Sequence, residues 1–486
     1  MGVGFSSPFS QPKGEDRLSA LPDDILLSIL ERVDDLRTVA RTSALSTRWR
    51  RLPWFLPELI IDADDFISGP HPRGKPIEAK VIHDAMLTLT AATRSLFAKP
   101  QRESAVAELQ LEIYLIDTFL CDNIGPLVSD AVDRGLLKDL DLAILDEKGT
   151  SGRSPSDEIK RAQDIDGFFC AYPSVLHCLT SLSLYGVSFL QLDIHHILFD
   201  CCNQLKHLYL YSCDVGPLWK IDAPNSKLRV LVLYMCCFEG IELISLPKLE
   251  KLSVLGWVSH SVPLSFGFVP SLEELDLAQI LLRRQHLYKL SDFLHGATGI
   301  HTLTLDSKGS AIWLQPEIKQ LTSAFRKLRK LLILGVFVEF DLLWTTTFLE
   351  AAPSIEMLHI EVCEHACELG DENDESGIFA ERINPLWELD FHASKNMLLR
   401  ELHIAHFRPL EQQLTFIRAI LERAPNLQTV MLNKDGEICN ECDAMALDVP
   451  PSASARPAFP RTNEEQDSVV RWVIDGTFFS GQIYFR

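Results

Sequence analysis

The sequence has few cysteines for its length, and several of them cannot pair with one another. Twelve cysteines in 486 residues are too few for a disulfide scaffold. Cys201 and Cys202 are neighbours in the sequence, as are Cys236 and Cys237, and this spacing is poorly suited to a disulfide bond. The pattern therefore predicts reduced thiols in a reducing compartment.

Positive charge and long hydrophobic runs are also scarce. Lys and Arg number 46 against 67 Asp and Glu, which gives a net charge of −21, and such a surface repels a phosphate backbone. The most apolar run, Leu331 to Val338, has eight residues, whereas a membrane span needs about 20. We therefore expect neither nucleic acid nor a membrane as a partner.

Targeting signals are weak at the start of the chain. The first residues lack the basic region and apolar core of a signal peptide, and no Asn-x-Ser/Thr glycosylation acceptor occurs, so we expect an intracellular protein in the nucleus and/or cytoplasm. Met1 to Ser6 fits a short N-myristoylation pattern. A single acyl chain would anchor the protein only weakly, so a flexible tail over residues 1–16 is the preferred interpretation.

A block of three short helices is predicted for residues 17–59. Pro22 suits the first turn of a helix, and Asp23 and Asp24 complement the positive helix start. Apolar residues at helical spacing give the first helix one apolar face, formed by Leu21, Ile25, Leu26, Ile29, Leu30 and Val33. A second helix is expected around Leu36 to Leu45 and a third around Ser46 to Leu52. So small a block leaves apolar side chains for a partner protein or for the rest of this chain.

Two motifs in this block resemble a known family. Residues 21–26 (LPDDIL), followed by RTS-x-LS-x-RWR at residues 41–50, resemble the F-box of plant F-box proteins, although residues 33–35 depart from the family pattern. The resemblance implies that the block docks on the Skp adaptor and, through it, a cullin. The residues expected to contact the adaptor are Leu21, Pro22, Ile25, Leu26, Ile29, Leu30, Val39, Leu45 and Trp49. The alternative for some of them is a place in the internal core of the block.

From residue 105 onward the template L-x-x-L-x-L, with any aliphatic residue accepted, recurs twelve times. Its middle positions are Leu109, Leu140, Leu182, Leu208, Leu231, Leu252, Leu275, Leu303, Leu331, Leu358, Leu402 and Val430. The steps between them are 31, 42, 26, 23, 21, 23, 28, 28, 27, 44 and 28 residues, mostly within or near the range of leucine-rich repeats. The predicted fold is therefore α/β, with an irregular leucine-rich-repeat solenoid and a curved parallel sheet following the helical block.

The two longest steps mark insertions, a polar loop at 149–156 and an acidic stretch at 361–381. We expect a linker and helical lead-in at 60–104, the solenoid at 105–433 and an extension at 434–486. Residues 459–466 (FPRTNEEQ) resemble the C-terminal region of plant F-box proteins of the leucine-rich and FBD-like type.

Cysteine also occurs at a defined place in three repeats. Cys213, Cys236 and Cys363 lie three residues beyond the last aliphatic position of their units, where the repeat pattern takes Asn or Cys to satisfy backbone groups at the turn. Cys439 and Cys442 have the spacing of half a zinc site, but no second pair follows at suitable spacing. We therefore expect no metal and no cofactor.

Tyrosine is concentrated on one predicted surface. Tyr185, His207, Tyr209, Tyr211 and Tyr234 occupy positions between or beside the template leucines in three successive units. Neighbouring strands lie about 4.8 Å apart, so Tyr185, Tyr211 and Tyr234 should form a ladder. Tyrosine is enriched at binding hot spots, so these five residues are candidates for binding a protein substrate. The alternative is a ladder that only stabilises the sheet.

No P-loop, G-x-S-x-G, Gly-rich dinucleotide turn or HExxH motif occurs, so we do not expect an enzyme. The resemblance implies a substrate-recognition subunit of a Skp-cullin-F-box ubiquitin ligase, with an unknown protein substrate on the repeats. The alternative is a leucine-rich-repeat scaffold that recruits no ligase, with the helical block as a packed cap.

Overall fold

The computed structural model describes residues 18, 20–33, 36–42, 44–67, 77–97, 105–116, 118–146, 154–257, 262–279, 288–307, 312–315, 320–338, 340–363, 397–434 and 457–486. The tail expected at 1–16, most of the two insertions, and Cys439 and Cys442 lie outside these residues. The chain divides into two compact units, one of residues 1–149 and 167–179 and one of residues 150–166 and 180–486.

The first unit begins with the helical block. Helix α1 spans Asp23–Leu30 and α2 spans Leu36–Thr42. The third helix expected at 46–52 is a series of turns followed by a 3-10 helix, η1, at Leu52–Phe55. The backbone N–H groups of Arg51 and Leu52 donate to the carbonyls three residues earlier, Arg48 and Trp49, so the segment does not continue the i to i−4 hydrogen bonds of an α-helix. Helix α2 is also shorter than expected, and near its end the Thr42 hydroxyl donates to the Val39 carbonyl at 2.6 Å.

Three parallel strands follow, β1 (Glu58–Asp62), β2 (Val106–Tyr114) and β3 (Leu137–Leu145), with β2 paired to both others. The helices of this unit include α3 (Ala79–Phe97), α4 (Gly125–Asp133) and α6 (Pro173–Cys178). Because β1 pairs with β2, the repeat sheet begins before residue 105, where the solenoid was expected to start. Leu56, Leu59 and Ile61 also fit the repeat template, and all three are buried.

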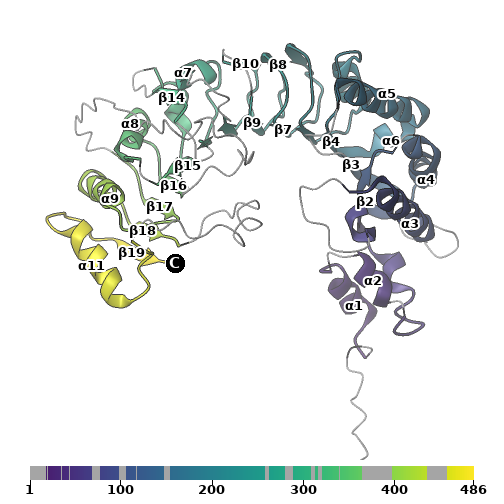
Figure 1. The fold of residues 1–486 in the computed structure, drawn as a ribbon, viewed down its shortest axis with the longest axis horizontal. Helices are drawn as coiled ribbons and strands as arrows, with labels where there is room; N and C mark the ends of the chain where they lie inside the picture. The colour runs from purple at the N-terminus through teal and green to yellow at the C-terminus, as the bar shows by residue number, and fades with distance from the viewer. Residues whose placement is uncertain are drawn as a thin grey trace, which may run out of the picture. The chain divides into compact units, whose positions relative to one another are not determined.

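Among the described residues of the second unit, eleven strands belong to one parallel sheet, drawn as arrows in Figure 1. They are β4 (Leu179–Tyr185), β5 (His207–Tyr211), β7 (Val230–Tyr234), β9 (Lys251–Leu255), β11 (Glu274–Ala278), β13 (Thr302–Asp306), β15 (Lys330–Phe337), β16 (Met357–Cys363), β17 (Glu401–Ala405), β18 (Thr429–Leu432) and β19 (Gln482–Phe485). Every template residue of the twelve units is at most 5% exposed. The repeat architecture predicted from the leucine pattern is therefore confirmed, and β19 extends its sheet into residues expected to be an extension.

The connections between these strands depend on repeat length. Where the step is 21 to 23 residues, the return segment is itself a strand, and β6 (Leu218–Asp222), β8 (Gly240–Ser245) and β10 (Leu264–Phe268) form a second parallel sheet. Steps of 27 or 28 residues contain helical segments. An extended chain rises about 3.3 Å per residue and a helix about 1.5 Å, so the shorter repeats can span the return only in extended form.

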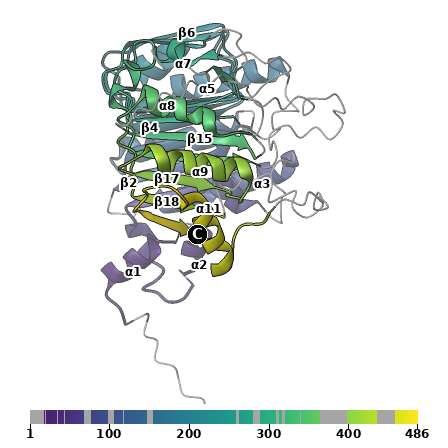
Figure 2. The ribbon, with the colours of Figure 1, turned by 90° about the vertical axis from the view of Figure 1, so that its left-hand side faces the viewer.

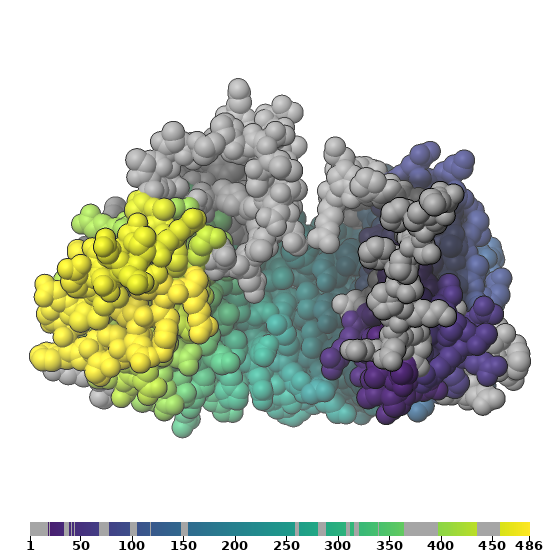
Figure 3. Space-filling view, turned by 90° about the horizontal axis from the view of Figure 1, so that it is seen from below, coloured from purple at the N-terminus to yellow at the C-terminus, as the bar shows by residue number. Residues whose placement is uncertain are grey.

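Helices cover one side of the main sheet in this unit. The helical segments of the connections are α7 (Leu290–Phe293), η6 (Ala324–Lys327), α8 (Thr346–Ala351) and α9 (Glu411–Arg423), with α11 (Asn463–Ile474) before β19. Figures 1 and 2 show α8 and α9 beside the strands that they connect. We call the opposite side of the main sheet its inner face. In Figure 3 the C-terminal residues, in yellow, adjoin the yellow-green residues that precede them in the chain. The Arg418 guanidinium of α9 lies 6.0 Å from the ring centre of Trp472 in α11.

The chain leaves several strands in a left-handed conformation. Gly186, Ser212, Met235 and Gly256 have φ values of 61°, 51°, 53° and 75°. Each donates its N–H to the last carbonyl of the next strand, at 2.7 to 2.9 Å. This geometry turns the chain while keeping that backbone hydrogen bond.

Cysteines follow two of these residues as the sequence predicts. The Cys213 thiol lies 3.4 Å from the Leu184 carbonyl, and the Cys236 thiol lies 3.3 Å from the Leu210 carbonyl. Burial raises the pKa of Cys236 well above its ordinary value. Both thiols therefore donate to backbone carbonyls inside the repeat core, and burial favours the protonated form of Cys236.

Replacing Met235 with glycine should stabilise the second unit. A left-handed conformation costs an L-residue about 1–2 kcal/mol and glycine adds about 0.5–1 kcal/mol of entropy cost, so the net gain is about 0.5–1 kcal/mol. Met235 is exposed, so little burial is lost. Urea denaturation measures the change. Val232→Gly, in the interior of β7, is the control and should destabilise; a destabilised Met235→Gly protein would contradict the strain argument.

Candidate functional site

The helical block separates the nine expected adaptor-contact residues into two groups. Leu26, Leu30, Val39 and Trp49 are buried, at 0 to 2% exposure. The remaining residues lie at the surface, with Leu21 half-buried and the others exposed: Pro22, Ile25, Ile29 and Leu45. The buried four hold the block together, and the exposed four, with Leu21, are the ones that a partner can reach.

Arg48 joins the two sequence motifs of the block. Its guanidinium donates to the Asp23 carboxylate at 2.6 Å and to the Leu21 carbonyl at 2.6 Å. Charge-assisted hydrogen bonds of this kind fix geometry as well as add stability. The RWR segment therefore holds the start of α1, which carries Pro22 and Ile25, in a defined position.

The inner face of the second unit carries the expected tyrosine ladder, defined as Tyr185, Tyr211 and Tyr234. The registers of β4, β5 and β7 place these residues side by side. The Tyr185 and Tyr211 rings stack with centres 4.3 Å apart and planes 7° apart, and the Tyr211 and Tyr234 rings are 6.0 Å apart. All three are half-buried, so their rings both contact one another and present area to solvent.

His207 and Tyr209 extend this aromatic area along β5. His207 lies between Ser181 and Val230 in the register, and Tyr209 lies between Ser183 and Val232. Both side chains are half-buried. The five expected substrate-contact residues therefore come together on three adjacent strands.

A charged cluster that the sequence analysis did not identify lies on the next strands of the inner face. Lys251 of β9 is 3.1 Å from the Asp276 carboxylate and 3.4 Å from that of Glu274, both on β11. The Ser253 hydroxyl also donates to Asp276 at 2.7 Å. Burial alone would lower the pKa of Lys251, but the two carboxylates outweigh it and raise the pKa. Listing the residues between the template leucines would have found this cluster.

A pair of histidines lies further along the same face. His359 of β16 and His403 of β17 are aligned in the register, with ring centres 6.1 Å apart. His403 Nε2 lies 3.2 Å from a Glu401 carboxylate oxygen. Burial, and then the neighbouring His403, lower the pKa of His359 below its ordinary value. The fold therefore favours the neutral form of His359 over the protonated form.

The stability of the folded protein should decrease as the pH is lowered, because His359 is harder to protonate in the folded chain. Below about pH 6.5 the unfolded chain binds a proton at this residue more readily than the folded chain does, so His359 contributes a loss of at most about 1.4 kcal/mol per pH unit. His359→Gln should flatten this part of the profile. Urea denaturation at pH 7.5, 6.5 and 5.5 tests the difference between the two proteins, and equal slopes for both would contradict it.

Within the described residues, no group of three or more His, Cys, Asp or Glu side chains is arranged to hold a metal ion. In the same part of the chain, none of the helices combines the length and apolar character needed to span a membrane. The surfaces described above consist of apolar, aromatic and paired charged side chains. Such surfaces recognise other molecules by contact.

The two units together define a leucine-rich-repeat protein with a helical block before the repeats. A family model described as "At1g61320/AtMIF1, LRR domain" matches residues 170–449, more than half of the chain, and a model of the F-box domain matches residues 18–53. The chain belongs to the F-box/leucine-rich-repeat family.

Curated relatives come from Arabidopsis thaliana. A putative F-box/FBD/LRR-repeat protein, At4g00315, is 24% identical over 370 residues, which cover 72% of this chain and 78% of the relative. F-box/FBD/LRR-repeat protein At5g22700 is 33% identical over 119 residues, 24% of this chain and only 23% of the relative. A solved structure titled "Crystal structure of TLR13-ssRNA13 complex" has a TM-score of 0.33 and 16% identity, covering 69% of this chain and 47% of that one; nothing about this chain follows from so loose a likeness.

Proposed function

We propose that this chain is the substrate-recognition subunit of a Skp-cullin-F-box ubiquitin ligase in the nucleus and/or cytoplasm. The F-box docks on the Skp adaptor, and the adaptor connects it to the cullin. The inner face of the repeats binds a protein substrate. The chain itself is non-catalytic: it holds the substrate near a charged ubiquitin carrier and so raises the effective concentration of the reacting groups.

The observation that carries this proposal is the apolar surface of the F-box. Ile25 is 45% exposed, Ile29 37% and Leu45 63%, although the block has its own core of Leu26, Leu30, Val39 and Trp49. Ile25 and Ile29 are four residues apart on one helix and therefore share a face. Apolar side chains exposed together mark a protein contact, and the family supplies the Skp adaptor as the partner.

Adaptor binding can be tested with surface variants that leave the core intact. Co-purification with a plant Skp adaptor should be lost in an Ile25→Ser, Ile29→Ser double variant. Leu87→Ser is the matched control, because Leu87 is 46% exposed on α3 of the same unit, and it should bind normally. If the folded wild-type chain binds no adaptor among several isoforms, the chain is instead a repeat scaffold whose F-box acts as a structural cap.

Substrate binding is proposed for the inner face around the tyrosine ladder. The ladder, His207 and Tyr209 offer rigid aromatic area next to the charged cluster of Lys251 and Asp276. Aromatic anchors beside charged groups suit a folded or extended protein segment. Cross-linking in plant extract should identify partners whose capture is lost in a Tyr209→Ala, Tyr211→Ala variant. Thr302→Ala, Thr304→Ala on β13 is the control; partners captured equally by both variants do not bind at the ladder.

A further inference from the structure

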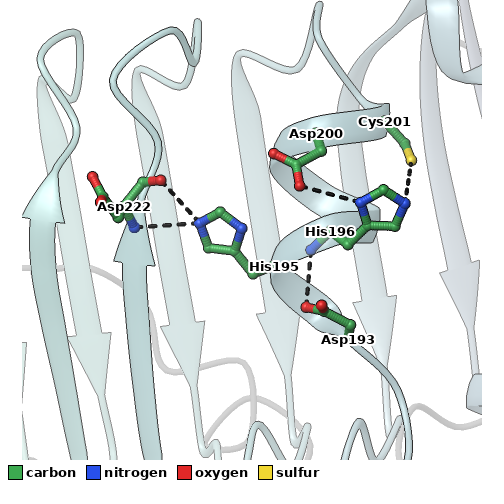
Figure 4. A network of polar contacts seen from close by, with 6 residues as sticks. All are labelled: Asp193, His195, His196, Asp200, Cys201 and Asp222. Carbon is green, nitrogen blue, oxygen red and sulfur yellow. Dashed lines mark hydrogen bonds and ion pairs between the residues drawn. The ribbon is translucent and has the colours of Figure 1, made fainter.

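A cluster of polar side chains lies on the segment of chain that connects β4 to β5. It plays no part in the proposed function. The helical segment η5 spans His196–Cys201 and is a π-helix. Its two ends carry an imidazole and a thiol five residues apart, and Asp200 lies beside the thiol (Figure 4). The i to i+5 hydrogen bonding of a π-helix is rare and often occurs at functional sites.

Both nitrogens of His196 have partners. Nδ1 lies 3.1 Å from the Asp200 carboxylate, and Nε2 lies 3.6 Å from the Cys201 sulfur. The backbone N–H of His196 donates to Asp193 at 3.1 Å, which fixes the start of the segment. With Asp200 accepting from Nδ1, Nε2 is directed as a base toward the Cys201 thiol.

The neighbouring histidine has a different role. His195 Nε2 lies 3.1 Å from the Asp222 carbonyl and 3.3 Å from the Asp222 N–H, at the end of β6 (Figure 4). One ring nitrogen can make only one of these hydrogen bonds in a given tautomer. His195 therefore joins η5 to the second sheet, and His196 alone of the two contacts the thiol.

We propose that Cys201 is a thiol-modification site that reacts with small disulfides, with His196 as its base. The Cys201 thiol transfers its proton to His196 Nε2, and the thiolate attacks one sulfur of the disulfide. A new sulfur–sulfur bond forms as the original one breaks, and the departing thiolate takes the proton from His196. The disulfide is thereby the oxidant, so the product is a mixed disulfide on Cys201 and one free small thiol.

The surroundings distinguish Cys201 from Cys202 and Cys237. His196 and Asp200 are 62% and 58% exposed, so a small reagent can approach their side of η5. Cys202 is buried, and burial raises its pKa to about 12. Cys237 is an exposed residue, but its thiol is partly buried. This partial burial, and then the negative charges of Asp214 and Glu158, raise its pKa. Among these, Cys201 alone pairs with an imidazole in the described residues.

The test uses the full chain and oxidised glutathione as the probe, with peptide mass mapping of each cysteine against time. At pH 7, Cys201 should react about tenfold faster than Cys237. His196→Gln should slow Cys201 by about fivefold and move its pH profile upward without changing the rate at Cys237. His195→Gln is the matched control and should leave the Cys201 rate unchanged.

Two results would overturn the proposal. Equal rates at Cys201 and Cys237 would show that the imidazole gives no activation. A Cys201 rate that is unchanged or faster in His196→Gln would show that access alone controls the reaction. Circular dichroism of each variant verifies folding, and Asp200→Asn, which keeps the shape of the side chain, should give an intermediate rate. A wild-type rate in Asp200→Asn would remove Asp200 from the site.

Discussion

Replacing Leu26 with alanine is expected to lower the free energy of unfolding of the first unit by about 2–5 kcal/mol. Leu26 is 0% exposed, and its neighbour Ile25 is 45% exposed. Truncating Leu26 leaves a cavity inside the helical block, whereas truncating Ile25 removes atoms of a side chain that is largely exposed to water. Ile25→Ala should therefore cost less than about 1 kcal/mol. Urea denaturation of the two variants measures this difference.

The same pair separates folding from adaptor binding. Ile25→Ala should weaken capture of the Skp adaptor while the fold is retained, and Leu26→Ala should lose capture only to the extent that the block unfolds. Lowering the temperature should therefore restore binding to Leu26→Ala and leave Ile25→Ala weak. If both variants lost the same stability, the assignment of Leu26 to the core and Ile25 to the surface would be wrong.

The helical block shows what an apolar pattern can and cannot predict. Spacing alone placed α1 correctly, because Leu26 and Leu30 recur at helical intervals and are both buried. The same spacing also selected Ile25 and Ile29, which are exposed, since periodicity reports a face and does not say whether the chain or a partner covers it. The prediction of a third helix at 46–52 was wrong. The spacing of apolar residues does not show which backbone hydrogen bonds form in the segment before Pro53, and these make turns.

The repeat array was predictable for a different reason. Each strand contributes the same two or three buried aliphatic residues, so the template fixes both the strand and its register. The ladder of Tyr185, Tyr211 and Tyr234 followed from that register and is confirmed by the ring contacts. Strand β19 was missed because Ile483 and Phe485 lack the first aliphatic position of the template.

The polar network on η5 could not be predicted from spacing. In an α-helix, residues i and i+4 share a face, which accounts for His196 with Asp200. Cys201 joins them because the segment is a π-helix, and the sequence pattern contains no signal for that geometry. The second sheet of β6, β8 and β10 was also missed, although the short repeat steps that force it were visible in the sequence.

Replacing Gly481 with alanine is expected to separate β19 from the repeat sheet at a cost of about 1–3 kcal/mol. A Cβ atom at this position would overlap the Gln428 carbonyl oxygen and lie 2.7 Å from its carbon. That carbonyl accepts the Gln482 N–H at 2.8 Å, and Gln482 pairs with Thr429 at the start of β19. Backbone atoms cannot move aside as a flexible side chain can, so the strand itself must shift.

Hydrogen exchange measures this effect directly. Amides of β19 should lose protection in Gly481→Ala, and those of β5 and β7 should keep theirs, because the repeats are held by contacts with their neighbours. Gly167→Ala is the matched control, since nothing lies within 4 Å of the added Cβ and the residue is exposed in α5 (Pro155–Ala171). It should stabilise the protein by about 0.5–1 kcal/mol, because alanine favours a helix over glycine. Unchanged protection of β19 in Gly481→Ala would mean that the close approach to Gln428 does not hold the last strand in place.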